Sequence, residues 1–233
     1  MFLGRAVTIK IPHERIVNDA IQLEQFRREA ISLAGIHSPN VVGIYDLGLT
    51  NAGAYVVMQH IEGRTVEEEI RRFGPMPERR AAGVLAQLVA GLAAMHAKGL
   101  VHGDIRSSNV LLARNGKVVL LDLGIVLDAR RASTVVGSGI PGDRRTPSRP
   151  TFTCDVYHVG LLVLFMLTGV DPARRSPRSG FEDLFRRLPE QFVELARRAL
   201  DTDSAQRFSS AASMKVAVEM ALAIEPTASA AGP

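Results

Sequence analysis

The stretch HGDIRSSNVLLARNGKVVLLDLG, residues 102–124, constrains the fold of this chain more than any other. A polar loop leads into an apolar run, an Asn-Gly pair follows at 115–116, and a second apolar run comes next. Asn-Gly is the dipeptide most typical of tight turns between antiparallel strands, because both residues tolerate positive φ. The stretch therefore predicts a loop, a β-hairpin and a second loop, with Asp104 and Asn109 before the hairpin and Asp122 after it.

These three polar side chains carry the strongest chemical signal in the sequence. Carboxylate and amide oxygens bind Mg²⁺ and leave coordination positions for phosphate oxygens. One carboxylate is left to receive a proton from an attacking hydroxyl group. Asp104 or Asp122 alone would be interpreted as the cap of a turn, but the joint pattern indicates a site for phosphate chemistry.

Before Gly63, the pattern predicts strands and one helix. Residues 5–11 (RAVTIKI) alternate and are β-branched, which is typical of a strand. Residues 18–34 change to a helical period, and two strand-like runs follow at 41–47 and 54–59. The apolar stripe expected on the helix consists of Phe26, Ala30, Leu33 and Ala34.

After Gly63 the chain becomes mainly helical. An amphipathic helix ends at a Lys98-Gly99 cap. Its expected inner stripe consists of Leu85, Leu88, Leu92 and Met95. Residues 129–153 predict a long loop, because they are rich in Arg, Ser, Thr, Pro and Gly. Further helices are expected to begin near Asp155, Phe181, Glu190 and Ser209. The longest apolar run, 156–170, is too short to cross a bilayer and predicts a buried helix.

Composition excludes several classes of protein. A chain of 233 residues that is 46% hydrophobic and 22% charged can bury a core. Such a composition excludes a disordered tail protein and a fibrous repeat. The single cysteine, Cys154, excludes a disulfide framework and a Cys-based zinc site, and it suits a reducing compartment. No charged-then-apolar N-terminus resembles a signal peptide, so a cytoplasmic location is expected.

The net charge of +4 would permit a nucleic-acid partner. The basic residues, however, come mostly as Arg pairs along predicted helices with acidic residues nearby, which is typical of a solvated surface. No nucleic-acid partner and no membrane segment are therefore expected.

Seven strings stand in order along the chain: VTIK, FRREAISLAGIHSPNVV, YVVMQHIEGRT, HGDIRSSN, LDLG, DVYHVGLLVLFMLTG and finally Arg207. On these strings the chain resembles a protein kinase, specifically the bacterial relatives of the eukaryotic Ser/Thr kinases. The resemblance implies an α+β, bilobal fold. Residues 1–62 would form an N-lobe with an incomplete antiparallel sheet, 63–222 a helical C-lobe with the catalytic loop and activation segment, and 223–233 a disordered tail.

The resemblance also implies a nucleotide site. Lys10 would hold the α- and β-phosphates of ATP, with Glu29 as its ion-pair partner. Met58 would guard the adenine pocket, and the backbone of Gln59 and Ile61 would hydrogen-bond the base. Lys10 is one of only four lysines among 28 basic residues, and it stands where a compact ammonium suits phosphates better than a planar guanidinium.

The catalytic roles implied by the resemblance fall on the loop and the hairpin. Asp104 would be the base that orients a hydroxyl group, and Arg106 would balance charge on the transferring phosphoryl. Asn109 and Asp122 would bind Mg²⁺. The implied activity is transfer of the γ-phosphate of Mg-ATP to a Ser or Thr hydroxyl of a protein substrate in signalling.

The chain also departs from the family pattern. It begins almost at the lysine strand, without two strands and the Gly-rich loop, which a misplaced start codon or a fragment would equally produce. Gly103 replaces an arginine, so activation is expected not to need a phosphate on the following loop. Arg106 replaces the usual lysine. No glutamate occurs in 125–154, which leaves Arg207 without the ion-pair partner typical of the family.

Two alternatives stay open. A pseudokinase, which binds a partner protein without turnover, would fit the missing Gly-rich loop and the Gly103 change. His-Gly-Asp at 102–104 also resembles small-molecule kinases of the aminoglycoside phosphotransferase kind. The turn at His37, the hinge string and the Leu-Thr-Gly helix favour the protein kinases. His102 is expected to be a packed histidine beneath the metal-binding segment.

Overall fold

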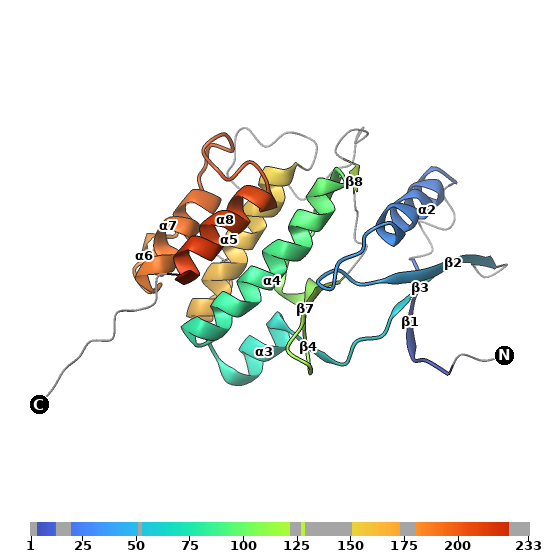
Figure 1. The fold of residues 1–233 in the computed structure, drawn as a ribbon, viewed down its shortest axis with the longest axis horizontal. Coiled ribbons are helices and arrows are strands. Elements are labelled where there is room, and N and C mark those ends of the chain that lie inside the picture. The colour runs from blue at the N-terminus through green and yellow to red at the C-terminus, as the bar shows by residue number, and fades with distance from the viewer. Residues whose placement is uncertain are drawn as a thin grey trace, which may run out of the picture.

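A small antiparallel sheet with one helix lies at one end of the molecule, and a bundle of helices forms the other end (Figure 1). The computed structural model describes residues 4–12, 20–50, 53–121, 127–128, 151–172 and 180–223. The elements of the sheet end are β1 (Val7–Lys10), α2 (Ala20–Ala34), β2 (Ile44–Thr50) and β3 (Gly53–Gln59). This arrangement confirms the expected bilobal α+β architecture.

The remaining elements follow β3 in the chain. They are β4 (Gly63–Thr65), α3 (Val66–Phe73), α4 (Glu78–Ala97), β5 (Leu100–Val101), the 3₁₀ turn η1 (Ser107–Asn109), β6 (Val110–Ala113), β7 (Val118–Leu120), β8 (Leu127–Asp128), α5 (Phe152–Thr168), α6 (Glu182–Phe185), α7 (Glu190–Ala199) and α8 (Ala211–Ala223). The expected long loop falls almost entirely, and the expected tail almost wholly, outside the described residues.

The first sheet has the order β1-β3-β2, with both pairings antiparallel. In β1, Lys10 lies opposite Val56, and Thr8 lies opposite Met58. Val7 and Ile9, which share the other face of β1, are exposed. Because side chains alternate along a strand, this register places Thr8 and Lys10 together on one face.

Helix α2 carries the predicted apolar stripe with one exception. Phe26, Ala30 and Leu33 are buried, but Ala34 is exposed at the last residue of the helix. The next strand also starts later than predicted, at Ile44 rather than at residue 41. Val41 instead forms a bridge to Leu120 of β7, because the chain there crosses to the second sheet.

The hairpin predicted from the Asn-Gly pair is present as β6 and β7 in a sheet of order β4-β6-β7. Gly116 has a φ of 81°. This is the left-handed conformation that the turn requires. The hairpin places Asn109 directly before β6 and Leu121 directly after β7, where the N–H of Leu121 donates to the carbonyl of Asn109 at 2.8 Å. The two ends of the hairpin therefore meet beside the polar loop.

Helix α4 is the centre of the helical lobe and packs against α5 and α8. Its stripe of Leu85, Leu88, Leu92 and Met95 is fully buried, as predicted, and the helix is followed by its C-cap Lys98 and the left-handed Gly99. By length and composition α4 could cross a membrane, yet 56% of its apolar window is buried in the fold, as in the core helix of a globular domain. Helix α5 is equally central, and it covers the apolar run predicted to be buried.

Asn40 connects the sheet end to the helical lobe. Its side-chain amide donates to the carbonyl of Val118 at 2.8 Å and to Gln87 Oε1 of α4 at 3.2 Å. Its own carbonyl accepts from the N–H of Leu120. A Cβ on Gly91 would lie 2.6 Å from the carbonyl oxygen of Asn40, so glycine at 91 is what allows this close approach.

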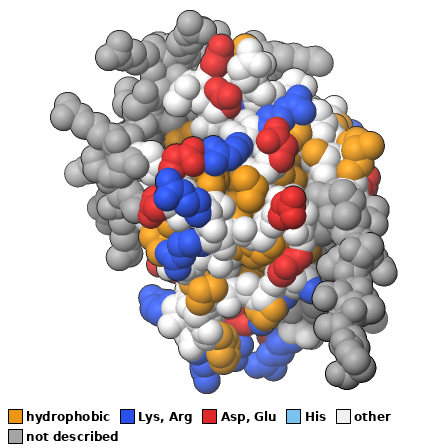
Figure 2. Space-filling model, turned by 90° about the vertical axis from the view of Figure 1, so that its left-hand side faces the viewer, with side chains coloured by type: hydrophobic (Ala, Val, Ile, Leu, Met, Phe, Trp, Pro, Cys, Tyr) orange, Lys and Arg blue, Asp and Glu red, His pale blue; other side chains and the backbone are white. Residues whose placement is uncertain are grey.

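Acidic and basic side chains alternate around apolar ones on the face of the helical lobe shown in Figure 2. The helices at this end of Figure 1 include α6 and α7, where Arg197 holds Glu182 by two hydrogen bonds of 2.6 and 2.8 Å. On this face acidic and basic side chains are mixed, as on a solvated surface.

Candidate active site

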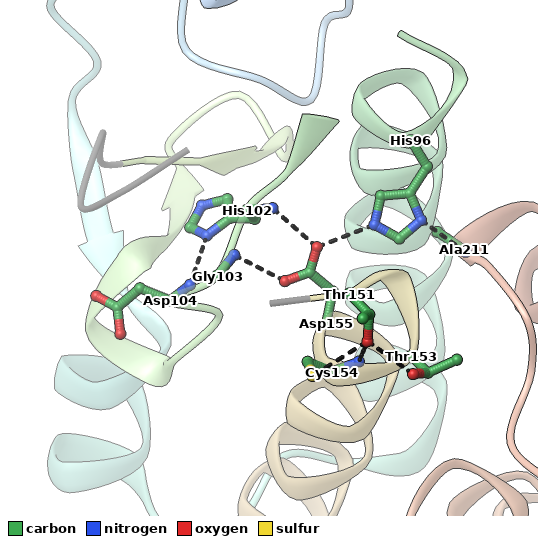
Figure 3. Close-up of polar contacts among 9 residues, drawn as sticks. All are labelled: His96, His102, Gly103, Asp104, Thr151, Thr153, Cys154, Asp155 and Ala211. Carbon is green, nitrogen blue, oxygen red and sulfur yellow. Dashed lines mark hydrogen bonds and ion pairs between the residues drawn. The ribbon is translucent and has the colours of Figure 1, made fainter. Parts of the chain in front are cut away.

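The candidate site is built around the buried carboxylate of Asp155, near the start of α5 (Figure 3). Asp155 is fully buried. Its Oδ2 accepts the backbone N–H of His102 and its Oδ1 accepts the N–H of Gly103, both at 2.8 Å. Thr151 caps the same helix by accepting the N–H of Cys154. The loop that carries Asp104 is therefore fastened to the start of the central helix.

His96 supplies a third donor to Asp155. Its Nε2 lies 2.9 Å from Asp155 Oδ2, and its Nδ1 accepts the backbone N–H of Ala211 at 3.1 Å. Since Nδ1 is an acceptor, the ring hydrogen is assigned to Nε2, which donates to the carboxylate. Phe152 stacks on the ring with centroids 4.1 Å apart. A buried charge needs such donors, and Asp155 has three.

His102 is the packed histidine that the sequence predicts. It is 2% exposed, its Nε2 lies 3.1 Å from the carbonyl oxygen of Leu121, and its Nδ1 accepts the N–H of Asp104 at 3.3 Å. Burial lowers its pKa below the ordinary value of 6.5, and the nearby Asp155 carboxylate opposes this shift. A neutral His102 therefore ties the loop that carries Asp104 to Leu121, the residue before Asp122.

Asp104 and Asn109 lie together in the structure, as predicted. The amide nitrogen of Asn109 donates to Asp104 Oδ2 at 2.8 Å and to the carbonyl of Asp104 at 2.9 Å. Asn109 is 7% exposed, while Asp104 is half-buried, and Figure 3 shows its carboxylate pointing away from Asp155. Arg106 lies between them in the loop and is exposed.

The sheet end supplies the other predicted positions. Lys10 is half-buried at the end of β1. Met58 is 7% exposed within β3, and its role beside an adenine pocket stays a prediction. The N–H of Gln59 donates to the carbonyl of Gly43 at 2.8 Å, so a contact of Gln59 with a base would use its carbonyl oxygen. Ile61 is half-buried two residues further on.

Comparison with known proteins decides the family. The sequence model described as "Protein kinase domain" matches residues 3–220. The chain belongs to the protein kinase family.

Two bacterial serine/threonine-protein kinases are similar to this kinase chain. The chain is 32% identical to the serine/threonine-protein kinase PknL of Mycobacterium tuberculosis, covering 93% of this chain and 59% of the relative. It is 32% identical to the serine/threonine-protein kinase PrkC of Bacillus subtilis, covering 74% of this chain and 28% of the relative. The chain thus spans about 28% to 59% of the lengths of these relatives.

A solved kinase structure has the same fold as this kinase chain. The kinase domain of Mycobacterium tuberculosis PknI matches with a TM-score of 0.75 at 22% identity, covering 92% of this chain and 85% of that one.

Two predicted site residues are not placed by the structure of this kinase domain. Asp122 lies outside the described residues, next to Leu121. Glu29 lies in α2, but its side chain is outside the described part, so its pairing with Lys10 stays a prediction. The roles of the remaining residues likewise stay predictions, and what the structure gives is their positions.

The contacts of Asp155 with His96 and with the backbone of the Asp104 loop were not predicted from the sequence. His96 follows Leu92 by four residues and so lies on the buried stripe of α4, and Asp155 opens the most apolar helix. A polar residue at a core position is a signal that its partner is buried too. Arg207, expected to lack an acidic partner, is 3% exposed and donates to the carbonyl of Asp201 at 2.7 Å.

Proposed function

We propose that this chain is an active protein kinase domain that transfers the γ-phosphate of ATP to a Ser or Thr hydroxyl of a protein. The observation that carries the proposal is the Asp104–Asn109 pair on a loop whose backbone is held by Asp155. Phosphoryl transfer depends on positioning and charge stabilisation more than on covalent chemistry by the protein. Because Asp155 in the core holds the loop backbone, the loop can keep Asp104 and Asn109 in a constant position.

Asp104 is proposed to bind the acceptor hydroxyl. Since Asn109 engages Oδ2, Oδ1 is the oxygen that would accept the hydroxyl hydrogen bond. The hydroxyl oxygen forms a bond to the γ-phosphorus, the bond between that phosphorus and the β,γ-bridging oxygen breaks, and ADP leaves. The hydroxyl proton passes to Asp104. Arg106, exposed in the same loop, would balance charge on the transferring phosphoryl.

Asn109 offers an oxygen ligand for a magnesium ion. The amide nitrogen of Asn109 is committed to Asp104, which leaves the amide oxygen, contacted by Ser108 Oγ at 3.4 Å, for a cation that prefers oxygen ligands. Asn109 and Asp122 would hold the ion, which when bound neutralises charge on the β- and γ-phosphates. Lys10, paired with Glu29, would hold the α- and β-phosphates, and the backbone of Gln59 and Ile61 would bind the base below Met58.

The decisive experiment follows γ-labelled ATP in the parent chain and in Asp104→Asn. The acceptors are a Ser/Thr peptide library, a Tyr library and kanamycin. We expect label on the Ser/Thr library alone, and loss of at least about a thousandfold in Asp104→Asn, since the variant removes the proton acceptor. Asp46→Asn, an exposed carboxylate on β2, is the matched control and should transfer like the parent.

A thermal melt separates nucleotide binding from transfer. Mg-ATP at about 100 times its dissociation constant should stabilise the parent and Asp104→Asn by about 2.7 kcal/mol each. Stabilisation without labelled product would contradict the transferase proposal and indicate a nucleotide-binding pseudokinase. Neither stabilisation nor transfer in a folded sample would indicate a protein-binding module, and label on kanamycin would indicate a small-molecule kinase.

A further inference from the structure

Gly103, the residue directly before Asp104, has a left-handed backbone with a φ of 76°. L-residues with side chains rarely adopt this conformation, because Cβ then approaches the following carbonyl oxygen. Glycine adopts it as readily as a negative φ. The conformation at 103 sets the direction in which the chain enters Asp104.

The Asp155 carboxylate holds the backbone on the N-terminal side of this left-handed residue. Its two oxygens accept the N–H groups of His102 and Gly103, each at 2.8 Å. The φ rotation of Gly103 comes directly after these two N–H groups, so it sets how the chain leaves the peptide held by Asp155 and enters Asp104. Asp155 is fully buried and also hydrogen-bonded to His96, so the core packing and this contact set the position of its carboxylate.

The far side of Asp104 is fixed as well. The N–H of Asp104 donates to His102 Nδ1, and its carbonyl accepts from Asn109 Nδ2. The glycine between the Asp155 contacts and Asp104 is therefore the one residue whose backbone conformation connects the buried anchor to the reacting carboxylate.

We propose that Gly103 is a positioning residue, which lets the loop hold Asp104 in its working orientation through the Asp155 contacts without backbone strain. This inference rests on the phosphotransfer function proposed above. A side chain at 103 would make the same backbone strained, and other contacts would have to hold it. Glycine also offers no cation to a phosphate on residues 129–150, whereas the Asp155 contacts hold the loop backbone without one.

The test compares Gly103→Ala and Gly103→Asn with the same changes at Gly116. Gly116 is also left-handed, with a φ of 81°, has open space around it and lies in the β6–β7 turn. All four variants should lower Tm, Ala more than Asn, because Asn populates the left-handed region several-fold more readily. Only the changes at 103 should lower kcat, by about tenfold or more for Ala and less for Asn, with KM for ATP unchanged.

Equal kcat for Gly103→Ala and Gly116→Ala would overturn the proposal. So would a lower kcat for Gly103→Asn than for Gly103→Ala, because that order reports side-chain size rather than backbone conformation.

Hydrogen exchange at the amides of residues 102 and 103 gives a readout that is independent of turnover. Protection should fall in Gly103→Ala, fall less in Gly103→Asn and stay unchanged in both Gly116 variants. Retained protection in Gly103→Ala would contradict the proposal even if the parent transfers no phosphate, whereas an inactive parent with this exchange pattern would contradict only the transferase function.

Discussion

His96 Nε2 lies 2.9 Å from Asp155 Oδ2, and this hydrogen bond joins the last turn of α4 to the first turn of α5 in the core. The same oxygen accepts the N–H of His102, and His96 Nδ1 accepts the N–H of Ala211 at the start of α8. Three helices and the loop that carries Asp104 are thus joined through His96 and the buried Asp155 carboxylate. The position of Asp104 is thereby coupled to the packing of the helical core.

Replacing His96 should destabilise the whole domain. His96→Leu leaves Asp155 one donor short and the N–H of Ala211 unpaired, and breaking one partner of such a buried pair costs about 3 kcal/mol. Urea unfolding measures the loss. His37→Leu removes an exposed histidine. This control should change the free energy of unfolding by less than about 0.5 kcal/mol. Comparable losses in the two variants would contradict a specific contribution of the His96 contact to the free energy of unfolding.

The close approach of Asn40 to α4 predicts opposite effects at two glycines of one helix. Gly91→Ala would place Cβ 2.6 Å from the carbonyl oxygen of Asn40, so the sheet end must shift. The domain should lose about 2 kcal/mol from this overpacking. Gly83→Ala meets nothing within 4 Å. It should gain up to about 1 kcal/mol from helix propensity. Thermal melts of both variants show whether each change raises or lowers stability. Unchanged stability in Gly91→Ala would mean that the contact between Asn40 and α4 can shift at little cost.

Stability should fall as pH drops below the ordinary histidine pKa. Burial lowers the pKa of His102 and of His158 below 6.5 in the folded state. As pH falls through 6.5 the unfolded state takes up protons that the folded state does not, so unfolding becomes easier until the folded pKa is reached. Each histidine should cost up to about 1 kcal/mol between roughly pH 7.5 and 5.5.

His158→Gln tests this pH dependence. Within the described residues His158 Nδ1 is buried without a hydrogen-bond partner. Because glutamine takes up no proton, the replacement should reduce the loss of stability at low pH. Urea unfolding at the two pH values, with His37→Gln as the exposed control, provides the measurement. If the free energy of unfolding of His158→Gln changes with pH as much as that of the parent, His158 does not contribute to the pH dependence.

Arg207 should resist even a conservative change. Its Nε donates to the carbonyl of Asp201 at 2.7 Å, and its guanidinium lies 4.8 Å from the ring centroid of Tyr157. A lysine has neither the planar fork nor the stacking face, so Arg207→Lys should cost about 2 kcal/mol. Arg197→Lys at the exposed Glu182 pair should cost less than about 1 kcal/mol. Chemical unfolding of the two variants compares them, and equal costs would contradict a structural role for Arg207.

Local signals determined much of this protein from sequence alone. The Asn-Gly pair predicted the β6–β7 hairpin, because these two residues favour the tight turn between antiparallel strands. The three- and four-residue spacing of the leucines predicted which face of α4 is buried. The spacing placed Asp104 and Asn109 in one short loop, and the structure joins their side chains by a hydrogen bond.

The tertiary structure alone decided what holds that loop. His102 and Asp155 are 53 residues apart, and His96 and Ala211 are 115 apart, so no local pattern could pair them. Strand β2 began later than predicted because Val41 is drawn to β7 by the Asn40 contacts, which override local β propensity. Propensity and spacing act over a few residues, whereas the partners of a buried polar group are set by how distant elements pack, and in this chain packing anchors the catalytic loop.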